Sequence, residues 1–288
     1  TESGNIGAVK VLMIGMHDLI GGIETYIMNY YRNIDRTKVQ IDFINMYSKL
    51  CFQDEIVAAG GVVHNVTNVK KNPMKYKKQL MAILKEGKYD IVHVNLMSAA
   101  NALPITVAKE AGVKTIIAHS HNSNTPKGLV RKIMHLMNKK KLVGAATDYF
   151  ACSKLAGDWM FGNEISERGE LIIIKNAIDT EKFKFHEEKR KDLRHKLNFQ
   201  DKFVVGHIGR FEYQKNHEFL IDIFEKIYER NKNALLFLVG EGSLEEEIKN
   251  KVERLGLSSN VVFFGITNEI SDILQAIDVF VLPSRFEG

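Results

Sequence analysis

The fold of this chain is indicated most clearly by the stretch VFVLPSRFEG at residues 279–288. The stretch opens with a short, continuous apolar run, which is typical of a strand buried on both faces of a parallel sheet. A small polar turn that contains Glu287 follows directly. Ligands of α/β sheets bind beyond the carboxyl ends of the strands. The stretch therefore predicts an α/β protein with functional residues in the turn at 283–288.

A second stretch with the same plan lies at 203–216. A buried strand is predicted at its start, and the loop GRFEYQKN follows it. The loop carries two cations, Arg210 and Lys215, and ends at Asn216, a residue type that commonly caps helices. The helix that follows would offer free N–H groups and a favourable dipole to an anion. These groups together suit a diphosphate, whose charge they stabilise through charge-assisted hydrogen bonds.

Strand and helix patterns alternate along almost the whole chain, which predicts parallel sheets with helices on both faces. Strands are expected at 9–16, 41–45, 62–66, 90–96, 114–120, 148–152, 171–175, 203–208, 235–239, 261–264 and 278–282. Helices are expected at 23–34, 74–86, 99–111, 127–142, 154–161, 216–231, 244–255 and 268–276. A charged, weakly patterned stretch at 181–200, with a short helix, interrupts the series. We therefore expect two doubly wound domains, at 1–185 and 186–288, of which the second is shorter than usual and incomplete.

Glycines stand at two further strand ends. Gly21 and Gly22 follow the first strand, with Glu24 close behind. Adjacent glycines let the backbone approach a ligand or adopt positive φ. Gly240 and Gly242 follow a strand of the second domain, where they either make tight turns or line a ligand.

Histidines mark the end of the predicted strand at 114–120. We interpret His119 and His93 as buried structural residues. An uncharged His121, at the end of the strand, is suited to bind a hydroxyl group of a ligand.

The composition, with 45% hydrophobic and 26% charged residues over 288 positions, is that of an ordinary globular protein. The sequence has no apolar run of the ~18 residues that a membrane span needs and no secretory signal pattern. Cys51 and Cys152 lack metal-type spacing and predict a reduced, cytoplasmic protein. No Asp-x-Asp pair is present to hold a divalent ion on a diphosphate. We therefore expect neither a metal nor another cofactor.

The net charge of +5 is concentrated in two basic segments, at 70–78 and 127–141. The second has the periodicity of a basic amphipathic helix. Such a helix either lies on an anionic membrane surface or packs its apolar face on its own domain, and the sequence leaves both open. Aromatic residues do not interleave with these charges, as binding to single-stranded nucleic acid would require, so no nucleic-acid partner is expected.

Together, GRFEYQKN at 209–216 and PSRFEG at 283–288 resemble the donor-site signatures of retaining GT-B glycosyltransferases of glycosyltransferase family 4. The resemblance covers nearly the whole chain and implies two Rossmann-like domains facing each other across a cleft. In the family the second signature continues as Glu-x7-Glu. The partner glutamate would fall beyond Gly288, so the chain is expected to be a fragment of a longer enzyme.

The resemblance also assigns roles to residues. Arg210 and Lys215 would contact the donor diphosphate, Glu287 would accept hydrogen bonds from the donor sugar, and His121 would lie beside the transferred sugar. These four are the expected catalytic residues. The donor would further be bound, through backbone or side chain, at Gly21, Gly22, Gly209, Asn216, Gly240, Gly242 and Gly288.

The activity implied by the resemblance is metal-independent, retaining hexosyl transfer from a nucleoside-diphosphate sugar, with UDP as the commonest nucleotide of such enzymes. The acceptor would be a saccharide or lipid-linked hydroxyl in bacterial capsular, exo- or lipopolysaccharide biosynthesis. The location would be the cytoplasm, peripherally at the inner face of the membrane. Two alternatives stay open: a non-hydrolysing sugar-nucleotide epimerase with the GT-B fold, and a non-catalytic sugar-nucleotide-binding protein.

Overall fold

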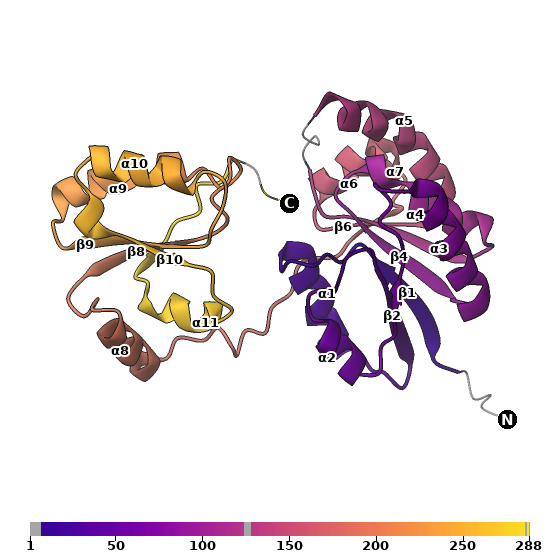
Figure 1. The fold of residues 1–288 in the computed structure, drawn as a ribbon, viewed down its shortest axis with the longest axis horizontal. Coiled ribbons are helices and arrows are strands. Elements are labelled where there is room, and N and C mark those ends of the chain that lie inside the picture. Colours follow the sequence, from indigo (N-terminus) through magenta and orange to yellow (C-terminus); the bar gives the residue numbers. More distant parts are fainter. Residues whose placement is uncertain (1–6, 124–127, 286, 288) are drawn as a thin grey trace. The chain divides into compact units, whose positions relative to one another are not determined.

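The computed structural model describes residues 7–123, 128–285 and 287 (Figure 1). The chain divides between Ile178 and Asp179 into two compact units. The predicted boundary lay a few residues later, between 185 and 186. The structure assigns the intervening residues to the second unit, where Gln275 accepts from the N–H of His186 and donates to the carbonyl oxygen of Lys184.

The first unit is built on a seven-stranded parallel sheet with the order β3-β2-β1-β4-β5-β6-β7. Its strands are β1 Val9–Ile14, β2 Val39–Asn45, β3 Val63–Asn65, β4 Ile91–Leu96, β5 Thr115–Ser120, β6 Asp148–Ala151 and β7 Leu171–Ile173. In register, Val11 of β1 pairs with Ile41 on one side and Ile91 on the other. The strand order reverses between β1 and β4, which makes their carboxyl ends the switch point of this sheet.

Helices cover both faces of this sheet because β1 is apolar on both sides. Val11 and Met13 pack against α1 Gly22–Asn33 and α2 Gln53–Ala58. Leu12 and Ile14 belong to the core of the opposite face (Figure 1). That face is covered by α3 Pro73–Gly87, α4 Leu103–Glu110, α5 Leu129–Ala145, α6 Lys154–Phe161 and α7 Asn163–Glu167, and the 3-10 helix η1 Ala99–Asn101 precedes α4.

The second unit has a four-stranded parallel sheet with the order β10-β9-β8-β11. Its strands are β8 Phe203–Ile208, β9 Ala234–Val239, β10 Val261–Gly265 and β11 Val279–Phe280. One face packs on α9 His217–Arg230 and α10 Glu245–Arg254. The other packs on α8 Glu187–Lys196, α11 Ile270–Ile273 and the 3-10 helix η3 Leu274–Ala276, while a further 3-10 helix, η2 Ser258–Asn260, precedes β10. The strand order reverses between β8 and β11.

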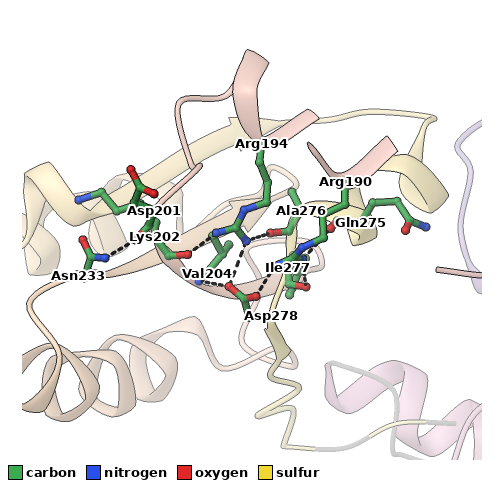
Figure 2. A network of polar contacts seen from close by, with 10 residues as sticks. All are labelled: Arg190, Arg194, Asp201, Lys202, Val204, Asn233, Gln275, Ala276, Ile277 and Asp278. Atoms are coloured by element: carbon green, nitrogen blue, oxygen red, sulfur yellow. Dashed lines mark hydrogen bonds and ion pairs between the residues drawn. The ribbon is translucent and has the colours of Figure 1, made fainter. Parts of the chain in front are cut away.

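A network of polar contacts fixes α8 to the start of β11. Figure 2 shows Arg190 and Arg194 reaching from α8 to the carboxylate of Asp278. Arg194 is 7% exposed and also donates to the carbonyl oxygens of Ala276 and Lys202. Asp278 Oδ2 accepts from Arg194 and also from the N–H of Val204 in β8, the latter over 2.7 Å. The arginines, one helical turn apart, therefore anchor β11 beside β8.

The predicted doubly wound α/β architecture is confirmed in both units, and the differences are local. The short helices α2 and α7 were not expected, because each offers too few residues for a helical period. The helix expected at 99–111 is divided into η1 and α4, since Pro104 near the start of α4 cannot donate to a preceding turn. The helix expected at 268–276 is likewise divided into α11 and η3. No helix in the described part of the chain is both long and apolar enough to cross a membrane.

Candidate functional site

The loops that follow β8 and β11 lie side by side, because these strands are neighbours in the sheet. The side-chain amide of Asn216 donates to the carbonyl oxygen of Pro283 over 3.2 Å. The N–H of Arg285 donates to the carbonyl oxygen of Gln214 over 2.8 Å. Open α/β sheets bind ligands at such a switch point. The structure thus brings together the two stretches that the sequence indicated most clearly.

An ion pair joins the two loops. Lys215 Nζ lies 2.6 Å from Glu287 Oε1, with the side chains 24% and 42% exposed. Burial alone would raise the pKa of Glu287, but the hydrogen bond and the positive charge of Lys215 outweigh it and lower that pKa. Glu287 is therefore an ionised carboxylate at neutral pH, which can only accept hydrogen bonds.

Arg210 is the second residue of the loop after β8 and is exposed. Among the residues that the structure describes, its guanidinium makes no ion pair, so its charge is available to a ligand. Next to it, Phe211 is fully buried and exchanges backbone hydrogen bonds with the loop after β9, accepting from Leu244 and donating to Glu241. This buried anchor holds the Arg210 backbone in place while the side chain stays in solvent.

Asn216 occupies the N-cap position of α9, but its side chain does not cap the helix. The residue has φ +56°, in the left-handed region, and no hydrogen bond from its side chain to the first turn. The expectation of a side-chain cap is wrong: the amide nitrogen donates to the carbonyl oxygen of Pro283, and the amide oxygen, the atom that would accept from the first turn, has no hydrogen-bond partner among the described residues. The first N–H groups of α9 therefore have no cap from Asn216, and they remain donors for an anion at the helix N-terminus.

The glycines of these loops are required by close packing. Gly240 has φ +134°, and a Cβ there would overlap the carbonyl oxygen of Gly209. A Cβ on Gly242 would overlap the backbone of Phe211, and one on Gly209 would lie 2.9 Å from His207 Nε2. These contacts set the course of the loop that carries Arg210. Binding of a ligand by the glycines themselves stays a prediction.

Two buried histidines beside these loops were not singled out as site residues from the sequence. His217, at the start of α9, is 3% exposed and stacks on Phe211 with ring centroids 4.1 Å apart. Burial, together with the nearby His207 and Lys215, lowers the pKa of His217 to about 3. His207 lies edge-on to it, and its Nδ1 is 2.8 Å from the carbonyl oxygen of Val281. Burial keeps both rings neutral, and they serve as packing groups near the ion pair. The only signal in the sequence was that His207 lies in a buried strand and His217 at the start of a helix.

The first unit carries its own candidate residues at the carboxyl ends of β1, β4 and β5. His121, just after β5, has Nε2 2.8 Å from Asn95 Oδ1 of β4. The amide nitrogen of Asn95 donates to the carbonyl oxygen of Ile14 over 3.2 Å. That bond turns Oδ1 toward His121, so His121 Nε2 must carry the proton. Burial lowers the pKa of His121 to about 4, with Glu24 opposing it, so the neutral ring keeps a free lone pair on Nδ1.

His121 is one of three histidines that pack together. Its ring stacks on His119 at 4.1 Å, and His119 Nδ1 lies 3.0 Å from His93 Nε2. Burial lowers the pKa of His93 to about 3 and also lowers that of His119. Tyr26 of α1 contacts both His119 and His121 edge-on at 5.0 Å. The arrangement agrees with the interpretation of His93 and His119 as structural residues that support His121.

The Gly21-Gly22 pair begins α1 without unusual backbone angles. Gly21 is the N-cap residue with extended backbone, and neither glycine has positive φ. Of the two roles left open for this pair, the structure therefore does not bear out positive φ, and close approach of a ligand stays a prediction. Glu24, in the first turn, is 4% exposed and accepts from both the backbone N–H and Nδ1 of His17, at 3.1 and 2.8 Å. Burial would raise the pKa of Glu24, but the bonds from His17 outweigh it and lower that pKa.

Two further expectations stay predictions. Gly288, expected at the donor phosphates, lies outside the described residues. Within the described ranges, no group of three or more His, Cys, Asp or Glu side chains is arranged to hold a metal ion. Metal independence is the second expectation that stays a prediction.

Two parallel, doubly wound units, each with a strand-order reversal in its sheet, are the architecture of GT-B proteins. Residues 20–182 match the family model described as Glycosyltransferase Family 4, and residues 188–288 match that of Glycosyl transferases group 1. The first match alone covers more than half of the chain. The chain therefore belongs to glycosyltransferase family 4, as the sequence resemblance implied.

Relatives of known name agree with this family. The chain is 31% identical to "Putative glycosyltransferase EpsF" of Bacillus subtilis (strain 168) over 93% of its own length and 71% of that protein. It is 28% identical to the UDP-Gal:alpha-D-GlcNAc-diphosphoundecaprenol alpha-1,3-galactosyltransferase of Escherichia coli, over 97% of this chain and 74% of the relative. The names of both relatives place them among glycosyltransferases.

Solved structures share the GT-B fold. Anabaena Alr3699/HepE in complex with UDP and glucose superposes with a TM-score of 0.76 at 20% identity, covering 96% of this chain and 74% of that one. WaaG, a glycosyltransferase involved in lipopolysaccharide biosynthesis, gives 0.68 at 15% identity, over 96% and 75%. At these identities the likeness establishes the fold alone.

Proposed function

We propose that this protein is a retaining glycosyltransferase that moves a sugar from a UDP-sugar to an acceptor hydroxyl. The observation that carries the proposal is the ion pair of Lys215 with Glu287 at the switch point of the second sheet, beside the exposed Arg210. The choice of UDP is supported by a relative whose name gives UDP-Gal and by a fold neighbour solved with UDP.

The cations of the second unit suit the donor diphosphate. When the glycosidic bond breaks, the diphosphate gains negative charge. Lys215 Nζ, the Arg210 guanidinium and the uncapped N–H groups of α9 all lie on the loop or helix start after β8. Fixed donors of this kind stabilise charge that develops in the transition state. They supply the role that a divalent ion has in metal-dependent transferases, so the proposed reaction needs no metal.

Glu287 suits the sugar rather than the phosphates. Its carboxylate is ionised and would repel an anionic diphosphate, but it accepts hydrogen bonds from hydroxyl groups. Lys215 holds one carboxylate oxygen at 2.6 Å, and this contact fixes the side chain in place. We assign Glu287 to the hydroxyl groups of the transferred sugar.

His121 of the first unit is assigned to a sugar hydroxyl as an acceptor. Asn95 fixes the proton on Nε2, and the low pKa keeps the ring neutral. Nδ1 can then accept from a hydroxyl group at any physiological pH.

Retention would follow if the acceptor attacks on the face from which the nucleotide leaves. The departing phosphate would then take the acceptor proton, without a nucleophile from the protein.

The acceptor is proposed to be a saccharide, free or lipid-linked, in the assembly of a bacterial surface polysaccharide. The names of two relatives support this class: one acts on a diphosphoundecaprenol-linked sugar, and CapM of Staphylococcus aureus is a capsular polysaccharide biosynthesis glycosyltransferase. CapM is 28% identical over 57% of this chain and 44% of its own length.

Release of nucleoside diphosphate by the full-length protein tests the proposal. UDP-, GDP- and ADP-sugars are supplied in turn with a chelator present, with and without saccharide and lipid-linked acceptors. Release from UDP-sugars that rises with an acceptor, with an unchanged anomeric configuration in the product, supports it. Conversion of the donor sugar without release indicates an epimerase instead. Binding of UDP without any product, across all acceptors, indicates a sugar-nucleotide-binding protein.

A further inference from the structure

Strand β11 ends earlier than the sequence indicates. The strand was expected to reach 282, but it ends at Phe280, and the N–H of Val281 makes one more bond, to the carbonyl oxygen of Gly206, over 2.9 Å. Pro283 has no N–H to donate, so the ladder with β8 cannot continue beyond this point. The course of the segment that carries Glu287 is therefore set by other contacts.

A side chain of β8 binds the carbonyl group at this strand end. His207 Nδ1 lies 2.8 Å from the carbonyl oxygen of Val281. Because a carbonyl oxygen only accepts hydrogen bonds, Nδ1 must carry the proton. Burial lowers the pKa of His207 more than the bond to Val281 raises it, so the ring is neutral. Its single N–H is therefore donated to Val281.

The same ring lies against the other parts of this site. His207 is fully buried, stacks on Phe280 with ring centroids 6.1 Å apart, and lies edge-on to His217 at 4.7 Å. A Cβ added to Gly209 would lie 2.9 Å from His207 Nε2 and 3.2 Å from Lys215 Cγ. The ring is thus enclosed by the end of β11, the loop after β8 and the start of α9.

We propose that His207 is a positioning residue, whose Nδ1–H holds the Val281 carbonyl group and thereby places the Glu287 carboxylate beside Lys215. The ring acts through the segment that carries Glu287 rather than by contact with the substrate. Displacement of a reacting or binding group by about 1 Å can lower a rate about 100-fold, so a bond at the start of this segment can affect transfer strongly. The effect on transfer rests on the proposed function, whereas the effect on the segment can be measured without any activity.

A role in packing alone predicts a different result. If the His207 ring only fills space, leucine should replace it without loss, because a buried aliphatic side chain fills most of the same volume. If the bond to Val281 matters, a donor is needed at the position of Nδ1. Asparagine carries its amide nitrogen at that position, whereas glutamine carries it where histidine has Nε2. Variants with leucine, asparagine and glutamine therefore separate the bond from the volume.

Amide hydrogen exchange in the full-length protein, followed by NMR, tests the position of the segment directly. The N–H of Arg285 reports on it, because this group donates to the carbonyl oxygen of Gln214 over 2.8 Å. In His207→Leu and His207→Gln its exchange should be about 3- to 10-fold faster, the effect of losing one hydrogen bond. In His207→Asn its exchange should stay within about twofold of the wild type.

Steady-state kinetics and calorimetric UDP titration of the same variants measure the consequence for transfer. The rate of sugar transfer should fall about 100-fold in His207→Leu and His207→Gln, but less than about threefold in His207→Asn. UDP affinity should stay within a few-fold of the wild type in all three variants, because Arg210 and Lys215 lie on the loop after β8.

Asn260→Leu is the matched control. Asn260 is buried, and its amide nitrogen donates to the carbonyl oxygen of Ala234, at the start of β9, over 3.1 Å. This is the same kind of bond in the same sheet, but it lies at the amino end of a strand. The variant should therefore lose stability and keep both the exchange of the Arg285 amide and the rate of transfer.

Two results would overturn the inference. One is wild-type exchange and wild-type transfer in His207→Leu, and the other is an equal loss in the leucine, asparagine and glutamine variants. Absence of transfer in the wild-type protein would instead end the proposed function. Slow exchange of the Arg285 amide in His207→Asn and fast exchange in His207→Leu would still support the positioning role in that case.

Discussion

Lys215 Nζ and Glu287 Oε1 lie 2.6 Å apart, although the two residues are separated by 72 positions in the chain. The pair links the loop after β8 to the loop after β11 at the place where the strand order reverses. One group is a cation suited to phosphate and the other an anion suited to hydroxyl groups. A sugar nucleotide needs both kinds of contact at adjacent positions.

Substitution of Glu287 should lower the rate of sugar transfer, whereas substitution of Lys215 should lower the affinity for UDP. Glu287→Gln removes the charge but keeps the shape, so we expect the rate of sugar transfer to fall about 100-fold, as on removal of one well-placed polar group. UDP affinity should stay within a few-fold or rise, because Lys215 is freed for the diphosphate. Steady-state kinetics and calorimetric UDP titration measure the two effects. Glu229→Gln, an exposed carboxylate near the C-terminal end of α9 that also pairs with a lysine, Lys226, is the control and should change neither. Loss of UDP affinity with unchanged transfer would contradict the assignment of Glu287 to the sugar.

Asn95 should control the protonation of His121. In Asn95→Asp the new carboxylate favours the imidazolium, so the pKa of His121 should rise from its value of about 4. The neutral ring is the acceptor, and the acidic limb of the pH–rate profile should therefore move to higher pH. Histidine resonances followed by NMR during titration give the pKa directly. Asn33→Asp makes the same change at the exposed end of α1 and should leave both curves in place. An unmoved acidic limb, despite a raised pKa, would show that His121 does not act as an acceptor.

Gly240 should tolerate no side chain. Gly240→Ala places a Cβ against the carbonyl oxygen of Gly209 at φ +134° and should cost about 2–4 kcal/mol of unfolding free energy. Gly256→Ala is the matched control, because Gly256 has φ +66° with nothing within 4 Å of the added Cβ. It should cost only about 1 kcal/mol, the penalty of the left-handed conformation. Urea unfolding separates the two, and equal midpoints would argue against the close approach of the loops after β8 and β9.

Asp278 should stabilise the second unit in a pH-dependent way. Burial opposes its charge, but bonds from Val204, Arg190 and Arg194 outweigh this and lower its pKa in the folded protein. Stability from a lowered carboxylate pKa is fully present above the unfolded value of about 4 and is lost as the pH falls through the folded value. Asp278→Asn should therefore cost about 2–3 kcal/mol at neutral pH and should flatten the acid dependence of unfolding.

The control for Asp278 is the exposed pair of Asp272 with Lys189, which also joins α8 to the 270–278 segment. Asp272→Asn should cost less than about 1 kcal/mol. Similar losses in the two variants, measured by chemical denaturation at neutral and acidic pH, would mean that burial of Arg194 adds nothing to the stability of the network.

The parts of the structure that could be predicted from the sequence are those that depend on neighbouring residues in the chain. Continuous apolar runs identified β1 and β8 as buried strands, and the residues after them as loops at a sheet edge. The network of Arg190, Arg194 and Asp278 was missed, because α8 has little apolar periodicity and its partner is more than 80 residues away. The spacing of the two arginines on one face of a helix was the available signal.

The candidate site shows the same division. Lys215 and Glu287 were singled out separately, and their direct contact depends on β11 pairing with β8, which no local pattern encodes. The contact of Asn95 with His121 was missed, because the partner of a polar residue in a buried strand can be predicted only when the neighbouring strand is known. The side-chain capping expected of Asn216 was wrong for a similar reason, since its amide nitrogen is turned toward a carbonyl group of the loop after β11, which no local pattern shows.

The most direct test of the account is the affinity of UDP for the wild-type protein and for Lys215→Ala, measured by calorimetric titration. A charge-assisted hydrogen bond to phosphate is worth about 1.5–3 kcal/mol, so the variant should bind UDP about 10- to 150-fold more weakly. Lys226→Ala removes an exposed lysine from α9, the helix that follows Lys215, and this variant should bind UDP as the wild type does. Equal affinity in Lys215→Ala and the wild type would contradict the claim that the donor nucleotide is held where the loops after β8 and β11 meet.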